Sequence, residues 1–157
     1  MCIRDRSVTV WIAIDDSTLD NGCLRVVPGS HRDRQLFQHR RDDDDGYTLN
    51  QIIDDPAINP EHAVDVTLKA GEFSIHDVYL VHGSRPNTSA LRRPGLTYRY
   101  MPTTSHFDHQ WAGEMTRDMG TTDMSDRTLY LMRGVDRCRK NNFDIGASTR
   151  LPLSQPA

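Results

Sequence analysis

Short apolar runs separated by turn-forming residues fill the first hundred positions of the chain. Val8–Ile14 (VTVWIAI) is continuous and rich in β-branched residues, which is typical of a buried strand, and Cys23–Val27 (CLRVV) is a second run of this kind. The residues between them, DDSTLDNG, favour a loop. We therefore expect the two strands to pair as a hairpin with a long loop.

Further strands are expected later in the chain. Apolar and polar residues alternate in Val64–Leu68 and in Leu96–Pro102 (LTYRYMP), and Phe73–Val81 (FSIHDVYLV) is a longer apolar run. The segment RTLYLMRG, residues 127–134, fits either one more strand or a short helix. No internal repeat or long amphipathic helix is visible in the sequence, so the pattern predicts an all-β domain of the sandwich, barrel or jelly-roll kind.

The charged stretch after the second run is expected to be a solvated loop. Residues 31–46 contain four consecutive aspartates, Asp42–Asp45. An EF-hand calcium loop needs alternating ligands, a central glycine and a closing glutamate, and this spacing is missing here. At 157 residues, the chain is expected to form one domain.

Composition excludes several classes of partner. The net charge of −3 provides no basic field for nucleic acid, and no apolar run is long enough to cross a bilayer. Cys2, Cys23 and Cys138 are an odd number without metal-type spacing, which suits a reducing compartment and a packing role. We expect a cytoplasmic protein that acts on a small-molecule substrate and binds neither nucleic acid nor membrane; the oligomeric state stays open.

Two of the seven histidines belong to one predicted strand: one lies within it and one comes directly at its end. His76 and His82 are six residues apart, so on a straight strand they share a face but stand roughly 20 Å from each other. One metal ion could not bind both unless the strand bends sharply, and we predict that His76 is not a metal ligand. His82 is the stronger candidate because it ends a strand and precedes Gly83, which allows a ligand to approach closely.

An arginine pair follows this histidine. If residues 73–81 and 96–102 are antiparallel neighbours, Arg93 returns to the end of the strand that carries His82. Arginine binds planar carboxylates with two parallel hydrogen bonds, and Ser84 adds a hydroxyl group nearby. This combination suggests a metal that binds a carboxylate-bearing cosubstrate. Composition alone favours the alternative, in which Arg92 and Arg93 are surface charges.

Two long segments carry a more specific signal. VTVWIAIDDSTLDNGCLRVVPGSHR and LKAGEFSIHDVYLVHGSRPNTSALRRPGLTYRYMP, within residues 8–102, resemble the phytanoyl-CoA dioxygenase family. The resemblance implies a double-stranded β-helix, the jelly-roll core, over residues 7–102, incomplete at its N-terminus. It also implies an Fe(II)- and 2-oxoglutarate-dependent dioxygenase that hydroxylates a small organic substrate. Residues 103–157 match more loosely and are expected to be an irregular C-terminal extension that packs on the same domain.

The resemblance also assigns roles to particular residues. His82 corresponds to the distal iron ligand, and Arg93 corresponds to the arginine that holds the distal carboxylate of 2-oxoglutarate. Ser84 assists this arginine, and Trp11 lines the cosubstrate pocket. The implied cofactors are Fe(II) and 2-oxoglutarate, with ascorbate as an accessory reductant. No residue is assigned as a catalytic acid, base or nucleophile.

One departure from the family pattern is serious. The other two iron ligands come as His-x-Asp before the strand at Val8, and no such motif precedes it here. His106-Phe107-Asp108 has the spacing but the wrong position in the order. We therefore expect an N-terminally truncated chain that is inactive or nearly so alone, and we expect that Met1–Arg6 is not native sequence.

Two alternatives stay open at this point. One is a metal-free jelly-roll module for binding or interaction that has lost its iron site, which the missing ligands favour and the retained His82, Ser84 and Arg93 disfavour. The other is a cupin-type metalloenzyme without a keto acid, which needs several histidines on adjacent strands, a cluster that the sequence does not provide.

Overall fold

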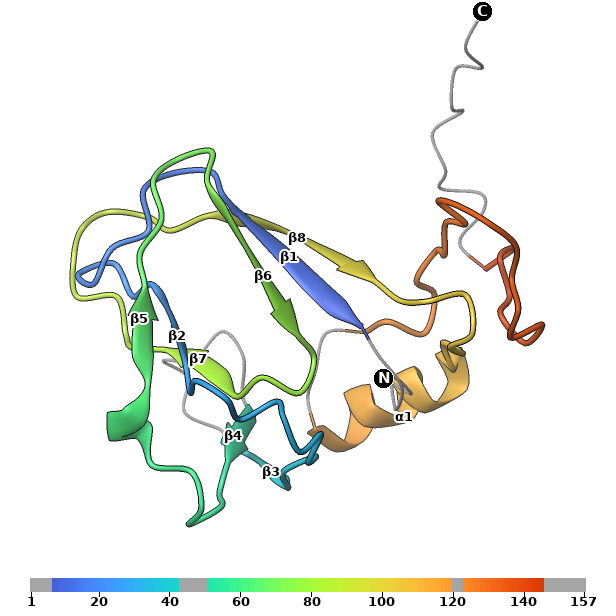
Figure 1. Cartoon of the computed structure of the whole chain (residues 1–157), viewed down its shortest axis with the longest axis horizontal. Coiled ribbons are helices and arrows are strands. Elements are labelled where there is room, and N and C mark those ends of the chain that lie inside the picture. Colours follow the sequence, from blue (N-terminus) through green and yellow to red (C-terminus); the bar gives the residue numbers. More distant parts are fainter. Residues whose placement is uncertain (1–6, 43–50, 120–122, 146–157) are drawn as a thin grey trace, which may run out of the picture. The chain divides into compact units, whose positions relative to one another are not determined.

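The computed structural model describes residues 7–42, 51–119 and 123–145 (Figure 1). Met1–Arg6 and most of the predicted aspartate loop lie outside these residues. In chain order, the elements are β1 Val8–Ala13, β2 Leu24–Val26, β3 His39–Arg41, β4 Gln51–Ile53, a 3-10 turn Pro60–His62, β5 Val64–Val66, β6 Phe73–Asp77, β7 His82–Ser84, β8 Gly95–Tyr100 and α1 His109–Met119.

The chain divides into two compact units. One comprises Arg6–His39 and Ile53–Met101, and the other comprises Met1–Asp5, Arg40–Ile52 and Pro102–Ala157. The first unit contains both three-stranded sheets, and the second contains α1. The packing of residues 103–157 on the sheet domain stays a prediction. No helix among the described residues is long and apolar enough to span a membrane.

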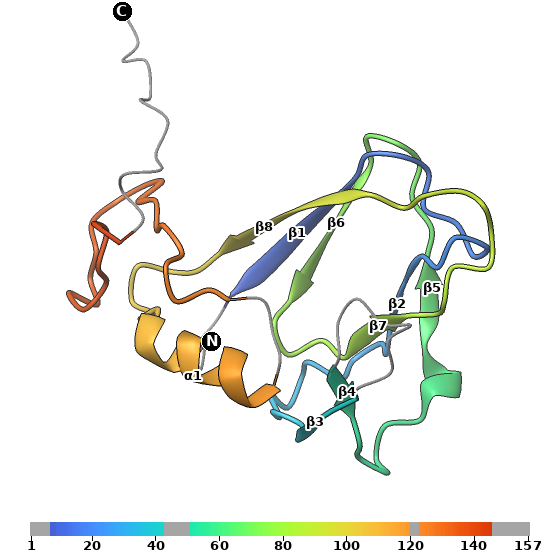
Figure 2. The same ribbon diagram turned by 180° about the vertical axis from the view of Figure 1, so that it is seen from behind.

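Two antiparallel sheets form the first unit. Their strand orders are β6-β1-β8 and β5-β2-β7, and a separate two-stranded sheet pairs β3 with β4. The chain crosses from one three-stranded sheet to the other between β5 and β6, again before β7 and again before β8, so the two sheets lie as facing layers (Figures 1 and 2). These crossings confirm the mainly β class and match the expected jelly-roll core.

Both predicted hairpins are wrong. β1 and β2 belong to different sheets, and β6 and β8 flank β1 instead of pairing with each other. The run at residues 73–81 is not one strand, because the Leu80 amide donates to the Asp77 carbonyl (3.1 Å) and the Tyr79 amide donates to the Asp77 carboxylate (2.9 Å). Such a turn carries the chain into the opposite sheet, and β7 begins only at His82.

The segments outside the sheets also differ from expectation. Residues 127–134 form neither strand nor helix. The predicted charged loop, residues 31–46, contains the strand β3, which pairs with β4 beyond the end of that loop. The sequence pattern missed α1. Its start is capped by Asp108, whose carboxylate accepts a hydrogen bond from the Trp111 amide (3.0 Å).

The two faces of the sheet β6-β1-β8 differ in character. Residues paired across antiparallel strands share a face, so the register places Thr9, Trp11 and Ala13 on one side, which we call the inner face. The opposite, outer face is apolar and largely exposed. Its exposed members are Val8, Phe73, Ile75, Leu96, Tyr98 and Tyr100. The fully buried apolar residues of this unit are few: Ala13, Cys23 and Tyr79.

A buried asparagine organises the loop between β1 and β2. The Asn21 side chain, 2% exposed, donates to the carbonyls of Asp16 (2.7 Å) and Arg92 (3.4 Å) and accepts from the Thr18 amide (2.7 Å). Gly22 follows with a φ of +76°, and an added Cβ would lie 2.5 Å from the Arg85 carbonyl oxygen. Asn21 and Gly22 therefore hold the segment between β7 and β8 against this loop.

This close approach predicts a difference between two glycines. Gly22→Ala should lower the free energy of unfolding by about 3 kcal/mol, because left-handed backbone strain adds to the backbone clash. Gly71→Ala is the matched control. Its φ is +87°, but nothing lies within 4 Å of the added Cβ, so only the strain of about 1 kcal/mol is expected. Urea unfolding of both variants checks this, and equal losses would contradict it.

Candidate functional site

The register of β1 groups the inner-face residues into rows. Thr9 lies between His76 of β6 and Arg99 of β8, and Trp11 lies between Ser74 and Thr97. Neighbouring rows are about 7 Å apart along the strand. The inner face thus carries a row with His76, Thr9 and Arg99 and a next row with Ser74, Trp11 and Thr97.

The two histidines of the opening motif come together at this face. The ring centroids of His76 and His82 are 4.9 Å apart, with the rings tilted by 52°. The expected separation of roughly 20 Å is therefore wrong, since it assumed one straight strand. The turn after Asp77 folds β7 back under β6. The geometric argument against His76 as a metal ligand no longer holds, and its role has to come from its surroundings.

His82 is held so that one ring nitrogen stays available. Its Nδ1 donates to the Leu80 carbonyl, 2.7 Å away, which leaves the lone pair on Nε2. Metal-binding histidines commonly use their other nitrogen in this way. The backbone before His82 is fixed by Ser30, whose hydroxyl accepts from the Val81 amide (2.9 Å), and by Val27, whose amide donates to the Val81 carbonyl (2.9 Å). The side chain thus fits a metal ion.

His76 is buried and neutral. It is 8% exposed, and its Nδ1 has no hydrogen-bond partner among the described residues. Burial, with smaller contributions from His82 and from the positive charge of Arg99, lowers the pKa of His76 to about 4. The hydroxyl of Ser74, two residues earlier on the same face, is also buried without a partner among the described residues. Unsatisfied buried polar atoms are rare in folded proteins, and a bound water or ion is one explanation for them.

Arg93 reaches the same face from the loop before β8, two residues before that strand begins. Its guanidinium lies 5.7 Å from the centre of the Trp11 ring, in cation–π range. Gly95 makes this possible, because any Cβ there would collide with the Trp11 indole. The preceding residue is anchored: Arg92 pairs with Asp15 (2.6 Å), and its carbonyl accepts from Asn21. Arg92 thus acts as a surface charge that supports the loop, and Arg93 faces inward.

The structure brings some predicted site residues together and leaves others apart. Arg93 contacts Trp11, and Ser84 lies exposed on β7, two residues from His82 on the same face. His106 and Asp108 lie in the other unit, where Asp108 caps α1. The described residues contain no group of three or more His, Cys, Asp or Glu that could hold a metal.

Sequence reasoning missed the supporting residues Asn21 and Ser30. Both lie within the quoted motifs, in DNGCL and in PGSH. Their composition indicated turns, but the contacts that they make with the segments before Arg93 and His82 are long-range. Nothing in the local pattern specifies those partners.

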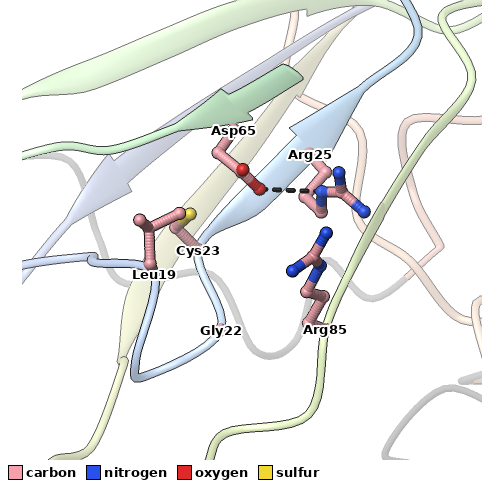
Figure 3. A pocket seen from close by; sticks show the side chains of 6 residues that line it. All are labelled: Leu19, Gly22, Cys23, Arg25, Asp65 and Arg85. Atoms are coloured by element: carbon pink, nitrogen blue, oxygen red, sulfur yellow. Dashed lines mark ion pairs between the residues drawn. The ribbon is translucent and has the colours of Figure 1, made fainter. Parts of the chain in front are cut away.

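A small pocket of about 140 Å³ lies on the other side of the β5-β2-β7 sheet (Figure 3). Arg25 pairs with Asp65 (2.7 Å) and donates to the Ala63 carbonyl (3.0 Å), and Arg85 lies at the border. Leu24 and Val26 of β2 are paired with Ser84 and His82, and Arg25 lies between them in the strand. Its side chain therefore points to the opposite face, so this pocket is not on the face of His82 and Ser84. Burial raises the pKa of the Cys23 thiol, and Asp65 raises it further, so the thiol is protonated and serves packing.

Comparison with known proteins decides the family. The family model for phytanoyl-CoA dioxygenase (PhyH) matches residues 3–95. The chain belongs to the phytanoyl-CoA dioxygenase family. A phytanoyl-CoA dioxygenase domain-containing protein 1 homolog of Dictyostelium discoideum is 33% identical over 94 residues, 59% of this chain and 34% of that protein. A probable alpha-ketoglutarate-dependent hypophosphite dioxygenase of Stutzerimonas stutzeri is 30% identical over 99 residues, 62% of this chain and 34% of that protein.

Solved structures agree on the fold. EvdO2 of Micromonospora carbonacea var. aurantiaca, crystallised with 2-oxoglutarate, superposes with a TM-score of 0.52 at 29% identity. The match covers 60% of this chain and 37% of EvdO2. This phytanoyl-CoA dioxygenase family chain therefore spans about a third of the length of the proteins that it matches.

The buried neutral His76 predicts a pH dependence of stability. Its folded pKa of about 4 lies below the ordinary 6.5, so between these values the unfolded chain binds a proton that the folded chain does not. The free energy of unfolding should fall as the pH falls from 6.5 to about 4, by up to about 1.4 kcal/mol per pH unit from this group. His76→Gln should remove this part of the slope. Urea unfolding with a chelator present measures it.

The control for this variant is His62→Gln. His62 is exposed at the end of the 3-10 turn, so its replacement should leave the slope as in the unchanged protein. An identical slope in His76→Gln and in the unchanged protein would show that the pKa of His76 does not differ between the folded and the unfolded chain, and the prediction would be wrong.

Proposed function

We propose that this chain carries the 2-oxoglutarate site and one iron ligand of an Fe(II)-dependent dioxygenase that hydroxylates a small organic substrate. The observation that carries the proposal is that Arg93, Trp11 and His76 follow one another along the inner face and lead to His82. Arg93 lies over Trp11, and Trp11 is one row from His76, which contacts His82. A dicarboxylate could thus reach from the guanidinium towards a metal at the free nitrogen of His82.

Each residue has a task that follows from its chemistry. Arg93 binds the distal carboxylate of 2-oxoglutarate through two charge-assisted hydrogen bonds, and Trp11 fixes the plane of the guanidinium. Ser84 offers a hydroxyl group beside His82. His82 presents Nε2 to iron, oriented by the Leu80 carbonyl. Bound iron, with 2-oxoglutarate and O2, supplies the oxidising chemistry, and the protein positions the reactants and limits water.

The rest of the iron site is part of the proposal. A facial site needs two more protein ligands, and the described residues offer no cluster that contains them. We propose that a His-x-Asp pair outside these residues completes the triad, as the family pattern implies. The absence of such a cluster also favours a second candidate, a metal-free binding module that retains the 2-oxoglutarate site.

The cosubstrate site can be tested by titration calorimetry with 2-oxoglutarate. Arg93→Gln should weaken binding about ten-fold or more, because the bidentate charged pair is lost. Arg85→Gln is the matched control: it removes a similar charge from the same unit, at a pocket on another face. Equal affinities of Arg93→Gln and the unchanged chain would contradict the assignment.

Turnover separates the two candidates. With iron, ascorbate and 2-oxoglutarate, the isolated chain should release little succinate, whereas a protein extended upstream to include a His-x-Asp motif should release it readily. In that extended protein, His82→Ala should abolish turnover. Robust succinate release by the isolated chain would show that other residues, such as His106 and Asp108, complete the site. No release by the extended protein would favour the binding module.

A further inference from the structure

An unpaired arginine lies at the small pocket on the other side of the β5-β2-β7 sheet. Arg85 directly follows β7, and its guanidinium forms no hydrogen bond, ion pair or ring contact in the part of the chain that the structure describes. The side chain is exposed, and Figure 3 shows it pointing towards the guanidinium of Arg25. Two cations that face each other in this way gain from an anion that lies between them.

Arg25 is held in a fixed position at the pocket. Its Nε lies 2.7 Å from a carboxylate oxygen of Asp65, and its Nη2 donates to the Ala63 carbonyl (3.0 Å). In spite of the short contact with Asp65, Nε is buried without a well-aligned hydrogen bond to any described residue. Nη1 has no partner among the described residues either. The guanidinium is therefore oriented in advance and keeps a donor for a ligand.

The charges around the pocket favour an anion. Two arginines line it with one aspartate, so one positive charge is left uncompensated, and the remaining lining residues are Leu19, Gly22 and Cys23. Burial raises the pKa of the Cys23 thiol, which is therefore neutral. Asp65 offsets Arg25, and none of the lining residues offsets Arg85. A single anionic group would interact with both guanidiniums.

The backbone of Arg85 is fixed beside the pocket. Gly22 packs so closely that an added Cβ would lie 2.5 Å from the Arg85 carbonyl oxygen. Three residues after Arg85, the Thr88 amide donates to the Asp20 carbonyl (3.0 Å). These contacts hold the start of the Arg85 side chain at the pocket and leave its guanidinium free to contact a ligand.

We propose that Arg85 and Arg25 bind a phosphate group, either of inorganic phosphate or of a small phosphate monoester. The pocket volume of about 140 Å³ is several times the roughly 30 Å³ that one water molecule occupies, which leaves room for a small polyatomic anion. Two guanidiniums from different segments suit a tetrahedral group better than a planar carboxylate. The site is independent of the proposed function, because it lies on the face of the sheet opposite to His82 and Ser84.

The test titrates the unchanged chain with inorganic phosphate and with methyl phosphate by calorimetry, with and without excess 2-oxoglutarate. Trimethyl phosphate, which is neutral, is the ligand control. At least one anion should bind more tightly than trimethyl phosphate and shift the amide NMR signals of Gly22, Cys23 and Arg85, with an affinity that does not depend on 2-oxoglutarate. Tighter binding of methyl phosphate identifies a monoester as the ligand, and tighter binding of inorganic phosphate identifies the free ion.

Three variants decide the role of Arg85. Arg85→Gln should weaken phosphate binding about ten-fold or more. Its free energy of unfolding should change little, because the side chain is exposed and has no partner among the described residues. Arg85→Lys keeps the charge but loses the planar fork, so it should retain part of the affinity. Arg32→Gln is the matched control, since it removes an exposed arginine of the same unit that does not line the pocket.

Several results would overturn the inference. They are failure of the unchanged chain to bind either anion, equal binding of trimethyl phosphate and methyl phosphate, equal phosphate affinities of Arg85→Gln and the unchanged chain, or an equal loss of affinity in Arg32→Gln and Arg85→Gln. The last result would show that the anion responds only to the total charge of the chain.

Arg93→Gln separates this inference from the proposed function. It should weaken 2-oxoglutarate and leave phosphate affinity unchanged. If Arg93→Gln weakens phosphate and Arg85→Gln does not, the anion binds at the inner face and the inference is wrong. If 2-oxoglutarate affinity does not depend on Arg93 while phosphate affinity depends on Arg85, the proposed function fails and the phosphate site stands.

Discussion

The pairing of β1 with two partners sets the positions of the inner-face residues of the candidate site. Thr9 and Trp11 each sit between one residue of β6 and one residue of β8, so a single strand sets the positions of His76 and Arg99 together. A slip of one residue would turn these side chains to the apolar outer face. The observed register is therefore a condition for the site, because it puts Thr9, Trp11 and His76 on the same face of the sheet.

Five strands were predictable from the sequence, whereas β3, β4 and β7 and the strand partners were not. Apolar runs identified β1, β2, β5, β6 and β8 within a few residues, and the family resemblance supplied the jelly-roll core. Pairing was wrong because neighbours in the sequence are joined across sheets here, which local patterns cannot show. The largest error came from Asp77: its carboxylate and carbonyl end β6 within an apolar run, and that turn brings His82 to His76.

The supporting contacts show a similar limit. Asn21 lies in a segment whose composition indicated a loop, yet its side chain is nearly fully buried and holds the backbone just before Arg93. Ser30 does the same for the residue before His82. Both are short polar side chains that form hydrogen bonds with backbone groups far away in the sequence, which otherwise would lack a partner there. The available signal for Asn21 and Ser30 was their place in the two segments that resemble the family. The physical reason for these residue types is given by their hydrogen bonds to the backbone before Arg93 and before His82.

Electrostatics explains why a neutral histidine belongs at this site. A protonated His76 would be a buried charge, and burial is the largest cause of its lowered pKa, followed by the His82 ring and the charge of Arg99. The imidazole therefore stays neutral near neutral pH. It then offers one donor and one acceptor nitrogen at the inner face without adding a charge to the site.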